Sequence, residues 1–201
     1  MSVAVMISIS VWIVTLEASA RMLAHLSWSA FATRKLCHAG CGLGIMLLDS
    51  REQPARLFVY AVAASSILMT WGYSPVPAFR FSRPRDVGVT AYLVLVSAWF
   101  WLLLPAPILA PVFFADPAGA IVGKACSHFL GAANPRWFQN KTVAGSAAVL
   151  LFTFASISFQ CSTAERVMIS VAAALAEAVG GEYDNLCLAA VVLVAWEVTR
   201  A

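Results

Sequence analysis

Eight apolar segments, separated by short connectors that carry charges, Pro or Gly, make up most of this 201-residue chain. Because a bilayer core about 30 Å thick takes about 20 apolar helical residues per span, a chain of this length holds at most about eight spans. A content of 61% hydrophobic and 11% charged residues excludes an ordinary soluble domain. The sequence therefore predicts an all-α, polytopic integral membrane bundle of seven or eight transmembrane helices. The expected spans are residues 2–20, 36–49, 55–73, 87–104, 106–123, 143–160, 164–180 and 186–199.

No repeat, linker or low-complexity tract divides the chain, so residues 1–201 are expected to form a single membrane-embedded domain. Two of the apolar segments differ from the others. The second is short and Gly-rich between Gly40 and Gly44, and the seventh is amphipathic and carries Glu165 and Glu177. We expect either one to be a buried helix that does not meet lipid on all sides.

The basic residues are unevenly divided between the alternate connectors. Nine fall on one predicted side and four on the other, and such a bias places the richer side in the cytoplasm. Every polar cluster with plausible chemistry lies on that same side. The richer group is Arg21, Arg34, Lys35, Arg80, Arg83, Arg85, Lys124, Arg136 and Lys141, and the poorer group is Arg51, Arg56, Arg166 and Arg200.

Net charge and cysteine content argue against two other classes of protein. The net charge is only +3, with the basic residues confined to connectors, so we expect no nucleic-acid partner. The five cysteines are an odd number, and most lie inside apolar segments. They are therefore expected to be reduced core residues and not a disulfide framework.

Asp116 lies where an apolar stretch meets a run of small residues. A carboxylate this close to hydrocarbon costs roughly 2.5–3.5 kcal/mol on insertion scales, so it needs a partner or a function. Magnesium takes one or two carboxylates together with nucleotide phosphates, which suits a metal site here. Alternatively, Asp116 is the N-cap of a helix with Pro117 at its first position.

Lys141 and Thr142 directly precede a long apolar segment. We expect Thr142 at or near a helix N-terminus, with Gly145 and Ser146 in the first turn. Unpaired N–H groups and the helix dipole at such a point suit a phosphate, and Lys141 adds a full positive charge. A capped helix beside a lysine that reaches the membrane surface explains the same residues equally well.

Arg34, Lys35 and His38 form a polar set at the start of the second apolar segment. The basic pair suits anionic oxygens, although simple anchoring at the cytoplasmic side explains it as well. An imidazole that enters an apolar segment needs a polar partner.

Acidic and amide groups gather before the last apolar segment. There Glu177, Asp184 and Asn185 offer acceptors that can bind a metal or orient a hydroxyl nucleophile.

Taken in order and spacing, four motifs resemble the polyprenol kinase family, which includes dolichol kinases, phytol kinases and their microbial relatives. The resemblance covers roughly residues 30 to 198. Ala144 before Gly145-Ser146 resembles the phytol kinase version. The motifs are Arg34-Lys35-x-x-His38, Asp116-Pro117-Ala118 followed by Gly123-Lys124, Lys141-Thr142-x-x-Gly145-Ser146, and Glu177 followed by Asp184-Asn185.

The resemblance implies a multi-span enzyme that uses magnesium to transfer the terminal phosphate of a nucleoside triphosphate, usually CTP, to a lipid alcohol such as phytol. It implies that Asp116 and Asp184 hold the metal, while Asp184 or Glu177 accepts the alcohol proton and Asn185 orients the nucleophile. The active face would be cytoplasmic, or stromal in a plastid. The groups that would bind the nucleotide phosphates are Arg34, Lys35, His38, Lys124, Lys141, Thr142, Gly145 and Ser146, with Asn185 beside them.

Two other functions fit parts of the same pattern. A membrane cytidylyltransferase that makes a CDP-lipid also joins CTP, magnesium and a lipid at one face. A small transporter carries polar residues in its spans too, but it is expected to place them near the bilayer midplane with access from both sides. The sequence does not choose between CTP and ATP, and it does not fix the alcohol, the oligomeric state or the host membrane.

Overall fold

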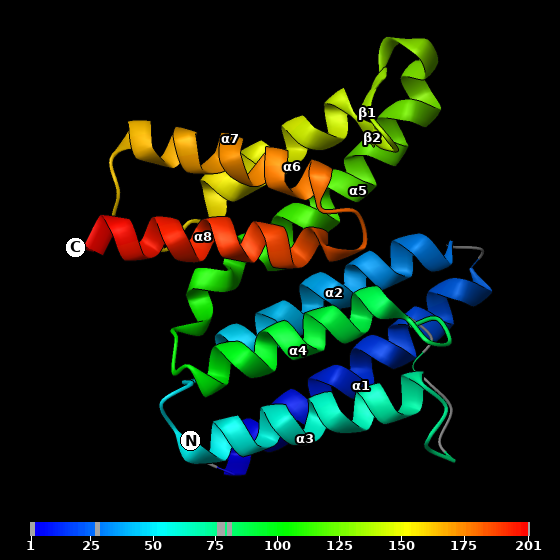
Figure 1. The fold of residues 1–201 in the computed structure, drawn as a ribbon. Coiled ribbons are helices and arrows are strands. Elements are labelled where there is room, and N and C mark those ends of the chain that lie inside the picture. Colours follow the sequence, from blue (N-terminus) through cyan, green and yellow to red (C-terminus); the bar gives the residue numbers. More distant parts are fainter. Residues whose placement is uncertain (1–2, 27–28, 76–78, 80–81, 201) are drawn as a thin grey trace. The chain divides into compact units, whose positions relative to one another are not determined.

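The computed structural model describes residues 3–26, 29–75, 79 and 82–200, so Arg80 lies outside the described residues. Each predicted apolar segment overlaps an α-helix within this part of the chain, which confirms the all-α class (Figure 1). The helices are α1 (Val3–His25), α2 (Ala30–Met46), α3 (Gln53–Thr70), α4 (Val87–Trp101), α5 (Ala110–Leu130), α6 (Val143–Ser156), α7 (Thr163–Val179) and α8 (Asp184–Arg200).

Two helical stretches among the described residues are long and apolar enough to cross a bilayer by themselves. They are Val3–Leu23 and Ala106–Ala133, and the latter joins the 3₁₀ turns η1 (Ala106–Leu109) and η2 (Gly131–Ala133) to α5. Most of the apolar part of the second stretch is buried inside the protein, as in a core helix. The number of spans therefore stays a prediction.

The chain forms two compact units, Met1–Ala106 with α1 to α4 and Pro107–Ala201 with α5 to α8. In the first unit, α1 packs closely on the Gly-rich face of α2. A Cβ at Gly40 would lie 2.6 Å from Leu16 Cδ2, and Trp12 Nε1 donates to Gly40 O at 2.8 Å. The glycines therefore serve helix packing. All five cysteines are free, as predicted, but only Cys37 is a buried core residue, packed against Leu16, and the other four are partly exposed.

Asp86 connects the starts of α2 and α4. It is the N-cap of α4 and accepts from Val89 N at 3.0 Å, while both Nη groups of Arg34 bind its carboxylate. Burial alone raises the pKa of Asp86. The hydrogen bonds from Arg34 and from two backbone N–H groups lower the pKa by a larger amount, so it lies below the ordinary value. Arg34 thus has a structural role inside the first unit.

The lowered pKa predicts a loss of stability in acid. A carboxyl whose pKa is depressed by folding contributes stability above its unfolded pKa of about 3.9, and this contribution disappears as the pH falls through the folded pKa. We expect Asp86→Asn, which keeps the N-cap, to cost about 1–3 kcal/mol at pH 7 and less at pH 2. Denaturation midpoints in detergent at both pH values measure this. Equal losses at pH 7 and pH 2 would rule out the charged pair as the cause.

The second unit contains a short hairpin that the sequence analysis did not anticipate. Strands β1 (Arg136–Phe138) and β2 (Lys141–Thr142) pair antiparallel, with Arg136 opposite Thr142 and Phe138 opposite Lys141. Gln139 at the turn takes a positive φ of 45°. The hairpin leads directly into α6 (Figure 1) and so fixes where Lys141 stands.

The backbones of helices α5 and α6 approach each other closely where glycines of the two helices meet. A Cβ at Gly145 would lie 3.0 Å from Gly119 O and 3.3 Å from Gly123 Cα. Small residues at such a crossing let two backbones approach closely, as in membrane helix pairs. The crossing holds the middle of α5 and the start of α6 in one fixed arrangement.

Candidate metal centre

Asp116 lies inside α5 and is buried, with 2% of its surface exposed. The reading of Asp116 as a helix N-cap is wrong, because α5 begins at Ala110 and continues to Leu130 with Pro117 in its interior. The Asp-Pro pair, which commonly starts helices, misleads here because the preceding apolar residues already belong to the same helix. The capping role is thus removed as an explanation for this buried carboxylate.

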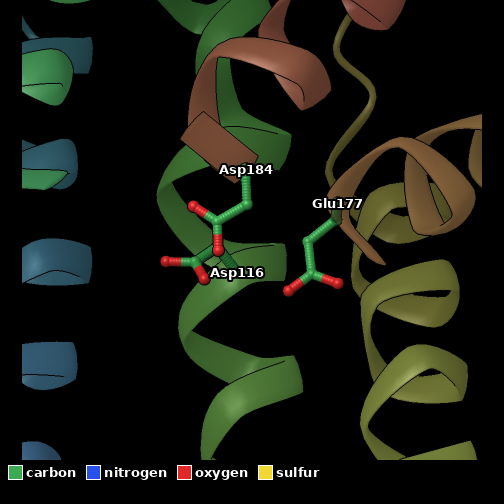
Figure 2. Close-up of side chains that lie close together, drawn as sticks. All are labelled: Asp116, Glu177 and Asp184. Carbon is green, nitrogen blue, oxygen red and sulfur yellow. The ribbon is translucent and has the colours of Figure 1, made fainter. Parts of the chain in front are cut away.

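Glu177 and Asp184 come together with Asp116 from two further helices. One carboxylate oxygen of each residue lies within 4.8 Å of those of the other two. Figure 2 shows the three side chains, Asp116 on α5, Glu177 near the end of α7 and Asp184 at the start of α8. In the described part of the chain, no other group of three or more His, Cys, Asp or Glu residues has ligand atoms close enough to one another to hold a metal ion.

A tight turn explains how Glu177 and Asp184 become neighbours. Between α7 and α8 lies the 3₁₀ turn η3 (Gly181–Tyr183), and Gly181 has a positive φ of 57°. A Cβ at Gly180 would lie 2.6 Å from Asp184 Cα, so the chain folds back too closely for any side chain there. The two glycines thereby bring the start of α8 beside the end of α7.

Lys141 supplies a positive charge to the cluster from strand β2. Its Nζ binds Glu177 Oε1 and lies 3.4 Å from Asp184 Oδ2. Burial alone lowers the pKa of Lys141, but the nearby Glu177, Asp184 and Asp116 carboxylates raise it more, so its pKa lies above the ordinary value. Lys141 therefore stays protonated at neutral pH.

The cluster suits a hard divalent cation. Glu177 is 3% exposed, and its Oε2 has no hydrogen-bond partner among the described residues; the same holds for Asn185 Oδ1. Three carboxylates within 4.8 Å of one another in a largely buried place need positive charge close to them, and a divalent cation can supply it. Oxygen ligands of this kind are those that Mg²⁺ takes.

The predicted phosphate-binding helix start is present, but the protein occupies its donors. Thr142 caps α6 and accepts from Gly145 N at 3.2 Å, as the sequence analysis expected. Val143 N donates to Pro135 O, and Ala144 N donates to the side chain of Asn134. Ser146 accepts from Trp137 Nε1. Phosphate binding at this start stays a prediction, and it would have to displace these bonds.

Asn134 is a structurally important residue that sequence reasoning missed. Its Nδ2 donates to Gly123 O at 3.2 Å and to Ser127 Oγ at 3.0 Å, while its Oδ1 accepts from Ala144 N at 3.0 Å. It therefore joins the end of α5 to the start of α6, next to Lys141. The Asn134-Pro135 pair was the available signal, since such pairs mark ordered turns.

Replacing Asn134 by Ala is expected to destabilise the second unit. The change leaves the Ala144 N–H without its acceptor beside a close helix crossing, which costs about 1–3 kcal/mol. In a chain of this size we expect the thermal midpoint to fall by roughly 3–9 °C. Asn140→Ala, at an exposed position of the same hairpin, is the control. An equal effect of the two substitutions would show that Asn134 does not brace the helix start.

Four other residues predicted to bind the nucleotide lie outside the carboxylate cluster. Lys124 is exposed on α5, eight residues after Asp116. Arg34, Lys35 and His38 belong to α2 of the first unit, where Arg34 binds Asp86 and the His38 ring lies 4.6 Å from the Tyr92 ring. The carboxylate cluster is built from the second unit alone.

Comparison of the chain with protein-family models, with curated proteins and with solved structures gives no match. The case for a function therefore depends on the residues and their geometry.

Proposed function

We propose that this chain is a magnesium-dependent phosphotransferase of the membrane. It transfers the terminal phosphate of a nucleoside triphosphate, CTP by resemblance, to the hydroxyl of a prenol such as phytol. The observation that carries the proposal is the convergence of Asp116, Glu177 and Asp184 from three helices around one lysine, Lys141.

The surface of α7 supports a membrane setting. Apart from Ile169, its buried face consists of small residues together with Glu177, and its exposed face includes large apolar residues such as Met168, Leu175 and Val179. A helix of a soluble protein shows the opposite arrangement, whereas small residues between helices and large apolar ones outside suit lipid. With the bias in basic residues, this favours several spans and an active face in the cytoplasm or stroma.

The cluster fits the chemical demands of phosphoryl transfer, which needs positioning and charge neutralisation more than covalent catalysis. Asp116, Asp184 and Glu177 would hold the magnesium ion, whose charge, when bound, offsets that of the phosphates. The alcohol oxygen forms a bond to the terminal phosphorus as the bond from that phosphorus to its bridging oxygen breaks. The products are a prenyl monophosphate and a nucleoside diphosphate.

The chain's own side chains have separate tasks in this reaction. Lys141 contributes a permanent positive charge beside the phosphates. Glu177 or Asp184 accepts the hydroxyl proton, and Asn185 orients the nucleophile. Lys124 adds charge for the nucleotide at the exposed side of α5.

Identification of the products tests the proposal. Purified protein is incubated with labelled CTP or ATP, magnesium and a panel of prenols, and the lipid and nucleotide products are separated. We expect a prenyl monophosphate and a nucleoside diphosphate. Pyrophosphate with a CDP-lipid would instead identify a cytidylyltransferase, and solute uptake by liposomes without any lipid alcohol would identify a transporter. Either result would overturn the proposal.

A further inference from the structure

The ammonium group of Lys141 lies at the carboxylates that a cation in the acidic cluster would bind. It contacts Glu177 Oε1 and Asp184 Oδ2, which belong to two of the three residues that can hold a metal. Only Oε2 of Glu177, buried and without a partner among the described residues, is left for another cation at that side chain. Lys141 thus already meets part of the charge demand of the cluster.

We infer that Lys141 and a divalent cation compete for Glu177 and Asp184, so that metal binding releases the lysine side chain. This deepens the proposed function, because it depends on the same cation site. Two positive groups held at the same carboxylates repel each other strongly in a poorly solvated place. The incoming cation therefore weakens the Lys141 contacts.

The released lysine has a use in the proposed reaction. While Lys141 binds Glu177 and Asp184, its charge is directed to carboxylates and is not available to a phosphate group. Once displaced, its long flexible stem lets the ammonium turn toward phosphates bound next to the metal. Metal binding and phosphate binding would then favour each other by the same factor, as linkage requires.

Binding of Mn²⁺ alone, followed by the electron paramagnetic resonance of the free ion in detergent, tests the competition without any turnover. We expect Lys141→Gln to bind Mn²⁺ about tenfold more tightly than the wild type, since the competing charge is gone. Arg136→Gln, on the same hairpin but outside the cluster, removes an equal charge and should change the affinity less than about twofold. Unchanged or weaker Mn²⁺ binding by Lys141→Gln would overturn the inference.

A second variant keeps the test decisive if Lys141→Gln does not fold. Lys141→Arg keeps the charge and can bind a carboxylate through two N–H groups, so we expect Mn²⁺ binding several-fold weaker than in the wild type. Equal or tighter binding by this variant would contradict the competition.

The outcomes separate this inference from the proposed function. If no prenol is phosphorylated but Lys141→Gln binds Mn²⁺ more tightly, the competition stands and the kinase proposal fails. If prenols are phosphorylated and Mn²⁺ affinity does not respond to Lys141, only the competition fails.

Discussion

Asp116→Asn is expected to reduce phosphoryl transfer at least about a thousandfold while the protein still folds and inserts into membranes. The substitution keeps the size of the side chain but removes one of three carboxylates that converge on the cation site. A thousandfold loss corresponds to about 4 kcal/mol of transition-state stabilisation, which is within what a positioned metal contributes. The measurement is the initial rate of labelled phosphate transfer to the prenol at saturating magnesium.

Asp49→Asn is the matched control for this experiment. Asp49 is exposed in the first unit and lies outside the acidic cluster, so the same chemical change there should leave the rate unchanged. The thermal midpoints of both variants should stay within a few degrees of the wild type. Turnover near the wild-type rate in Asp116→Asn would remove this residue from the site.

Gly145→Val is expected to destabilise the second unit by about 3 kcal/mol. Its Cβ would meet Gly119 O at 3.0 Å and Gly123 Cα at 3.3 Å, and both are backbone atoms that cannot rotate away. Helices α5 and α6 must then separate, and such overpacking typically costs 1–3 kcal/mol or more. Because α5 carries Asp116 and the start of α6 follows Lys141, weaker cation binding should accompany the loss of stability. Denaturant midpoints and Mn²⁺ titration in detergent measure the two effects.

Ala147→Val provides the comparison for Gly145→Val. It introduces the same residue two positions later in α6, on an exposed face, and should cost about 0.5 kcal/mol or less. If both substitutions had similar small effects, the close glycine crossing would not be what holds the site together.

Local sequence patterns predicted the helices because each depends on residues that are close in the chain. The apolar segments that became α1 to α8, the cap at Thr142 and the reduced cysteines all have local causes. Asp116 was correctly singled out as a buried charge in need of an explanation. Its place within the helix was not predicted, because an Asp-Pro pair is equally compatible with a helix start.

The pairing of distant residues could not be read from one sequence. Lys141 is separated in sequence from Glu177 by 36 positions and from Asp184 by 43, and Arg34 is separated from Asp86 by 52. Helical periodicity says which face a residue lies on but not which other helix covers that face. The β1–β2 hairpin was missed because its strands are very short and its turn depends on a positive φ at Gln139, a residue with no special preference for it.

The most direct test of the central claim is the position of Mn²⁺ in crystals of this protein, located by its anomalous scattering. We expect one strong peak bound by carboxylate oxygens of Asp116, Glu177 and Asp184, at metal–oxygen distances of about 2.1 Å, with Lys141 Nζ moved away from Glu177. A peak only elsewhere, or none at these three residues at saturating Mn²⁺, would contradict the claim that this cluster is a cation site.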